Sequence, residues 1–136
     1  MELPRYHRIT KAQIRLDATE CAKCGTLHFP PRPQCHSCGC PETTIKRLNG
    51  GGVLLSFSEV FRSGGVERGM PYFVGLVRLE EGITLFSQLT DVDRDSLAIG
   101  MEVEAVIRRV DELDEGLIFY GYKFRPKIGS GLPEAC

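Results

Sequence analysis

The chain has 136 residues, of which 42% are hydrophobic and 26% are charged, an ordinary composition for a soluble globular protein. Its formal net charge of −1 excludes a global positive field that would gather nucleic acid or an anionic membrane. The N-terminus lacks the apolar core of a signal peptide, and no apolar run reaches membrane-spanning length. We therefore expect a cytoplasmic protein that does not bind membranes.

Four of the six cysteines lie close together near the N-terminus. They form two CxxC pairs, each followed by a glycine: Cys21, Cys24, Cys35 and Cys38. Two such turns complete a tetrahedron of sulfurs with no open position, so we expect a structural zinc ion. We expect Cys40 and Cys136 to be non-ligands. Iron remains an alternative, because a four-thiolate site of the same geometry also suits it.

The composition changes near residue 50, where a glycine triplet separates a Cys/Pro-rich stretch from β-branched and aromatic runs. Five runs predict strands, at residues 53–61, 72–79, 83–89, 101–110 and 117–124. In the first run Val53, Leu55, Phe57 and Phe61 share one side, which indicates an apolar face. Residues 80–82 suit a hairpin, residues 111–116 an acidic turn, and residues 97–100 either a helical turn or a loop.

Five short antiparallel strands without a long helix favour a closed barrel, because closure removes the sheet edges that would otherwise aggregate. We therefore predict an all-β protein with a small irregular part. The predicted order is an N-terminal segment at residues 1–16, a zinc ribbon at 17–47, a five-stranded OB-type barrel at 48–127 and a flexible tail at 128–136.

The two cysteine motifs, followed by the runs at residues 48–53 and 71–77, carry a family resemblance. In this order they resemble the acyl-CoA-associated proteins that join a rubredoxin-like zinc ribbon to an OB fold. Members of that family are non-catalytic partners of thiolase-type enzymes and of 3-hydroxy-3-methylglutaryl-CoA synthase; one is the small zinc-binding subunit of benzoylsuccinyl-CoA thiolase. Many longer members begin with a helix. We expect that helix to be absent here, or reduced to a few residues between Arg5 and Leu16.

The resemblance implies that the chain docks on a thiolase-fold enzyme subunit and helps to hold CoA or acyl-CoA. CoA carries phosphates, an adenine ring and a long pantetheine, so the protein that holds it needs cations and apolar contacts. Residues 123–127 are further phosphate candidates, and the loop at residues 62–71 is a candidate binding loop. The expected CoA contacts are Phe29, Arg32, Arg62, Arg68, Tyr72 and Phe73.

Two other functions fit parts of the sequence. A zinc ribbon with an OB barrel also suits single-stranded nucleic acid, although the acidic stretches at 91–95 and 111–115 oppose it. A rubredoxin-like electron carrier would use the same cysteines with iron. An independent enzyme is not expected, because the three histidines form no Ser/His/Asp pattern, and we expect His28 and His36 to have structural or solvent-facing roles.

Overall fold

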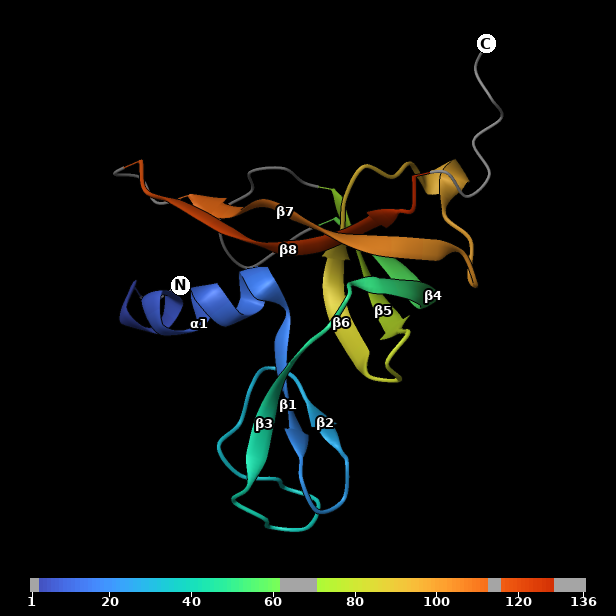
Figure 1. Cartoon of the computed structure of the whole chain (residues 1–136). Helices are drawn as coiled ribbons and strands as arrows, with labels where there is room; N and C mark the ends of the chain where they lie inside the picture. Colours follow the sequence, from blue (N-terminus) through green and yellow to red (C-terminus); the bar gives the residue numbers. More distant parts are fainter. Residues whose placement is uncertain (1–2, 62–70, 113–115, 129–136) are drawn as a thin grey trace. The chain divides into compact units, whose positions relative to one another are not determined.

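The computed structural model describes residues 3–61, 71–112 and 116–128. Two compact units divide the chain (Figure 1). The first contains the chain up to Asn49 together with Ile107–Tyr122, and the second contains Gly50–Val106 and the residues from Lys123 onward. Among the described residues, no helix is both long enough and apolar enough to cross a membrane.

The first unit contains a small three-stranded antiparallel sheet. Its strands are β1 (Asp17–Cys21), β2 (Leu27–His28) and β3 (Thr43–Arg47), in the order β2-β1-β3. On the central strand Ala18 is fully buried, and Cys21 ends the strand as its last residue. The backbone of the first cysteine is therefore held in place by the sheet.

The expectation that the N-terminal helix would be absent or very short is wrong. Helix α1 spans Leu3–Arg15, thirteen residues that precede the ribbon. Of its five half-buried residues, Tyr6, Ile9, Thr10 and Gln13 follow helical spacing, and the fifth is Ala12. The Tyr6 ring meets the ring of Phe119 edge-on at 4.5 Å. Because an isolated helix of this length is marginal in water, tertiary contacts of this kind are needed to hold it.

The second predicted feature, the five-stranded barrel, is confirmed. Its strands are β4 (Gly51–Val60), β5 (Tyr72–Leu79), β6 (Thr84–Leu89), β7 (Glu102–Glu112) and β8 (Ile118–Pro126). They close in the order β4-β5-β6-β8-β7, and β7 pairs back onto β4. Strands β6 and β8 run parallel where Leu89 pairs with Phe124, while β4, β5 and β6 pair antiparallel. The OB-type connectivity thus follows from one parallel contact in an otherwise antiparallel barrel.

The connections agree only in part with the predictions. Gly82 takes a φ of 91° in the tight β5–β6 turn, as a hairpin requires. A short 3₁₀ helix, η1 (Arg94–Ser96), precedes residues 97–100, which form a loop. Strand β7 continues through Glu112 into the predicted acidic turn. Residues 113–115, residues 62–70 of the predicted binding loop, and residues 129–136 of the predicted tail lie outside the described residues.

The predicted apolar face of the first barrel strand is also wrong. Leu54 is fully buried, whereas Val53 and Leu55 are only half-buried and Phe57 is exposed. The register of β4 against β5 shifts between Leu54 and Ser56, which marks a β-bulge at Leu55. A bulge breaks the two-residue alternation, so a pattern read straight through it assigns the wrong side.

The stability of the barrel should depend strongly on Leu54, which is fully buried in its core. Besides Leu54, the buried apolar side chains that the barrel strands contribute to the second unit are Val77, Leu79, Leu85, Leu89, Val103 and Phe124. These side chains come from every barrel strand, so truncating one of them leaves a cavity that its neighbours fill only partly.

We predict that Leu54→Ala lowers the free energy of unfolding by about 2–5 kcal/mol, because the side chain is fully buried. The adjacent Leu55→Ala serves as the matched control and should cost about 1 kcal/mol. Urea denaturation followed by circular dichroism measures both. A larger loss from Leu55→Ala than from Leu54→Ala would contradict the bulged register.

Candidate metal centre

Two knuckles with the same hydrogen bonds carry the four cysteines. In the first, the Cys21 N–H donates to the Thr26 carbonyl at 3.0 Å and the Gly25 N–H donates to the Cys21 carbonyl at 2.9 Å. The second knuckle, fourteen residues further along, repeats both bonds at 3.0 and 2.9 Å. The two glycines have φ of 72° and 74°, a left-handed conformation that a Cβ would strain. The repeated CxxCG motif therefore encodes a repeated backbone turn.

The knuckles bring the four predicted ligand sulfurs together within 4.8 Å of one another. The Cys21 and Cys38 sulfurs are 3.5 Å apart, and those of Cys24 and Cys35 are 3.6 Å apart. A tetrahedral zinc ion with Zn–S distances of about 2.3 Å needs sulfurs about 3.8 Å apart. These distances are far too long for a disulfide and close to the zinc geometry, so the residues fit the ion.

Backbone and hydroxyl donors favour the ionised form of the first two sulfurs. The pKa of the Cys21 thiol is lowered, chiefly by a hydrogen bond from the N–H of Cys24. Burial raises this pKa, but the N–H of Lys23 adds to the lowering, and the two N–H groups together outweigh burial. The hydroxyl and the N–H of Thr26 lower the pKa of Cys24 to about 6, with the hydroxyl oxygen 3.1 Å from the sulfur. The first knuckle is therefore prepared to supply thiolates.

The pKa of the fourth sulfur, that of Cys38, shifts in the opposite direction. The N–H of Cys40 is the largest influence on Cys38 and lowers its pKa, but the contacts with Cys21, Cys24 and Cys35, together with burial, raise the pKa to about 12. Four sulfurs this close cannot all be ionised unless a cation neutralises them. Metal binding must therefore release protons, and the bound ion should be lost as the pH falls.

A buried histidine lies directly behind the sulfurs. The Nε2 atom of His28 is 3.2 Å from the Cys35 sulfur, and the residue is only 3% exposed. Burial, followed by the positive charges of His36 and Arg32, lowers the pKa of His28. A neutral imidazole protonated at Nε2 can donate to a thiolate. The expected structural role suits His28, although no spacing in the sequence marked its contact with Cys35.

The predicted CoA contacts fall into separate groups. Phe29 and Arg32 lie in the loop after β2, where the Arg32 N–H donates to the Thr19 hydroxyl at 3.1 Å and the Phe29 ring meets Tyr122 at 5.6 Å. The Arg32 side chain is exposed. Tyr72 and Phe73 are consecutive in β5 and therefore project to opposite faces of the strand. Arg62 and Arg68 lie outside the described residues.

Two family models match the chain in the order that the structure shows. Residues 11–42 match the rubredoxin-like zinc ribbon domain of ChsH2, and residues 46–108 match the C-terminal OB-fold domain of ChsH2. A DUF35 domain-containing scaffold protein of Pyrococcus furiosus is 42% identical over 132 residues, which is 96% of each chain. The order of a zinc ribbon followed by an OB fold is thus shared over nearly the whole length.

Two further relatives are known as parts of enzymes. The benzoylsuccinyl-CoA thiolase subunit BbsA of Thauera aromatica is 34% identical and covers 81% of this chain and 75% of that protein. The solved structure of an Ltp2-ChsH2(DUF35) aldolase matches with a TM-score of 0.71 at 32% identity, over 88% of this chain and 92% of that chain. The chain therefore belongs to the DUF35 family, in which a ChsH2-type zinc ribbon precedes an OB fold.

Proposed function

We propose that this chain is a non-catalytic subunit that docks on a thiolase-type acyl-CoA enzyme and helps to hold the CoA thioester. The observation that carries the proposal is its similarity, over four-fifths of its length, to a subunit of benzoylsuccinyl-CoA thiolase. The similarity to the Ltp2-ChsH2(DUF35) aldolase, in which a DUF35 protein is paired with another component, supports the same role. The nucleophile for acyl transfer would then belong to the partner.

In this proposal the zinc ribbon at residues 17–47 is a structural platform, and the barrel spans residues 48–127. Cys21, Cys24, Cys35 and Cys38 would hold one zinc ion and fill all four of its positions. Such an ion has no place for substrate or water. Its binding free energy, on the order of 10 kcal/mol, would instead stabilise a three-stranded sheet too small to form a core.

The ribbon loop after β2 is the part of this chain that we propose to contact CoA. The Arg32 backbone is fixed at both ends, since its N–H donates to Thr19 and its carbonyl accepts from the Thr43 hydroxyl at 3.4 Å. Its exposed guanidinium can therefore meet a phosphate with little loss of backbone entropy. The half-buried Phe29 ring, three residues earlier, offers an apolar surface. Of Tyr72 and Phe73, only one can face the same ligand.

We predict that the purified chain carries one zinc ion and that Cys24→Ser loses most of it, because the substitution removes one of four thiolates. Cys40→Ser is the matched control, two residues beyond Cys38, and should keep a full equivalent. Zinc content by plasma mass spectrometry measures both. Equal zinc loss from the two variants, or iron in the wild-type chain, would contradict the assignment.

We predict that His28→Gln weakens zinc binding by about 10–100-fold, because the thiolate of Cys35 loses the hydrogen bond from a buried imidazole. His36→Gln is the control, since His36 is exposed and its ring lies 4.5 Å from the His28 ring. Competition with a chromogenic chelator gives both affinities. An unchanged affinity in His28→Gln would show that the contact with Cys35 contributes nothing to metal binding.

We predict that the chain co-elutes with a thiolase-fold enzyme from the same genome when the two are expressed together, and that only the complex turns over a CoA thioester. The reason is that the partner supplies the nucleophile while this chain supplies contacts to CoA. Size-exclusion chromatography and a thioester absorbance assay test this, with each isolated subunit as a control. Turnover by this chain alone, or failure to bind any such enzyme, would refute the proposed function.

A further inference from the structure

Helix α1 carries a net positive charge, whereas the rest of the chain carries a net negative charge. Its thirteen residues include four Arg or Lys residues and one His, and no Asp or Glu. Since the whole chain carries −1 and the helix +4, the remaining residues together carry −5. The four cations are exposed: Arg5, Arg8, Lys11 and Arg15. The charge of this chain is therefore segregated onto one short helix.

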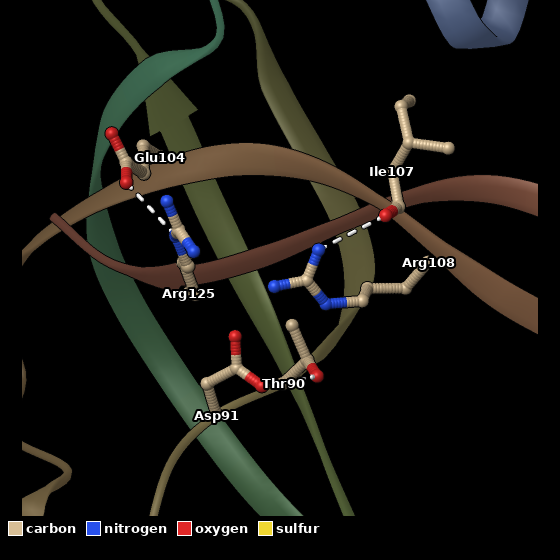
Figure 2. A network of polar contacts seen from close by, with 6 residues as sticks. All are labelled: Thr90, Asp91, Glu104, Ile107, Arg108 and Arg125. Carbon is tan, nitrogen blue, oxygen red and sulfur yellow. Dashed lines mark hydrogen bonds and ion pairs between the residues drawn. The ribbon is translucent and has the colours of Figure 1, made fainter. Parts of the chain in front are cut away.

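Ion pairs within the folded chain do not explain why α1 carries these four cations. None of the four forms an ion pair with a described residue. Elsewhere in the described chain six cations lie against carboxylates, and Figure 2 shows one of these pairs, Arg125 against Glu104 at 2.9 Å. The other cations paired in this way are Lys46, Arg47, Arg94, Arg109 and Lys127. Like charges three and four residues apart on α1 repel one another, and Arg5 in the first turn opposes the helix dipole.

The contacts of α1 within its unit fix which side faces solvent. Besides the ring contact with Phe119, the Tyr6 hydroxyl accepts from the Tyr120 N–H at 3.1 Å. With the Tyr6 side of the helix held, Arg8, Lys11 and Arg15 form a stripe at i, i+3 and i+7 along the exposed side. The rise of a helix makes this stripe about 10 Å long. We call these three residues the basic stripe.

We propose that the basic stripe is a docking surface for a carboxylate-rich face of the partner enzyme subunit. The proposal rests on the proposed function and adds to it the part of this chain that meets the partner. A helix surface is convex and spreads its cations over several turns, whereas a small anionic ligand is bound in a concave site. The fitting occupant is an extended surface with several separated carboxylates, which steers association and fixes orientation.

An acidic protein surface fits the charge distribution better than nucleic acid does. Nucleic acid presents a continuous line of phosphates, and proteins that bind it usually spread cations over a wide face. Here the residues outside α1 sum to −5 and would repel a long polyanion. A protein partner can confine its carboxylates to the area that faces the helix.

The test compares Arg8→Gln/Lys11→Gln with Lys46→Gln/Arg78→Gln, each in the full-length zinc-loaded chain. Both double variants lower the net charge by two, glutamine keeps a good helix propensity, and the control positions lie outside α1. Binding to the thiolase-fold enzyme is measured by interferometry at 50 and 300 mM NaCl. We expect Arg8→Gln/Lys11→Gln to raise the Kd about tenfold at low salt, mainly through slower association, and the control to change it less than about twofold.

The expected difference should shrink at high salt, because screening removes exposed electrostatic attraction. If Arg8→Gln/Lys11→Gln binds the enzyme like the wild type at both salt concentrations, the docking proposal is overturned while the proposed function stands. If the wild-type chain binds no such enzyme, the proposed function fails. In that case the ligand of the basic stripe is tested by titrating the ¹⁵N-labelled chain with a 20-residue oligoglutamate or with a 20-nucleotide single strand.

Saturating shifts of the α1 amides with oligoglutamate, lost in Arg8→Gln/Lys11→Gln, would support an acidic protein surface even without that enzyme. Tighter binding of the oligonucleotide would overturn the proposal in favour of nucleic acid. The absence of α1 shifts with either probe at low salt would overturn it as well.

Discussion

The architecture of the first unit depends on the close approach of four cysteine sulfurs. Two identical backbone turns place these sulfurs within 4.8 Å, a distance at which four thiolates repel one another strongly. The opposing pKa directions of Cys24 and Cys38 show the consequence, since one sulfur ionises readily and another resists. A divalent cation resolves this conflict and joins β1 to the loop before β3. Without it, a sheet with a two-residue strand would have little to hold it.

Most of the fold could be predicted from local patterns. The five barrel strands can be predicted because each is an apolar or alternating run next to a glycine-containing or acidic turn. The side of β4 that faces the core was not, because the bulge at Leu55 is set by pairing with β5 rather than by any signal within the strand itself. Helix α1 was missed for a similar reason. Its few apolar residues are too weak a signal alone, and the partner ring of Phe119 is 113 residues away from Tyr6.

The site divides in the same way. Spacing alone predicted the four cysteines, because CxxCG fixes a turn whose geometry is local. The contact between His28 and Cys35 depends on how the ribbon sheet folds back on itself, and a lone histidine carries no such information. The predicted CoA contacts came from residue chemistry and family resemblance without any spatial constraint. The structure accordingly divides the four of them that it describes between a ribbon loop, with Phe29 and Arg32, and two opposite faces of one strand, with Tyr72 and Phe73.

A metal centre closed by four thiolates leaves no position for substrate or water, so we expect this DUF35 chain to offer binding surfaces and charge to a partner. The barrel and the ribbon supply rigid surfaces, the loop with Arg32 supplies an exposed cation, and α1 supplies unneutralised positive charge. The small sheet of the zinc ribbon depends on an ion that the four sulfurs hold. The most direct test is zinc K-edge X-ray absorption of the purified full-length chain. A zinc ion held by the four cysteines should have four sulfur neighbours at about 2.3 Å. Three sulfurs with one nitrogen neighbour, which would make His28 a ligand, or an absent zinc edge would contradict it.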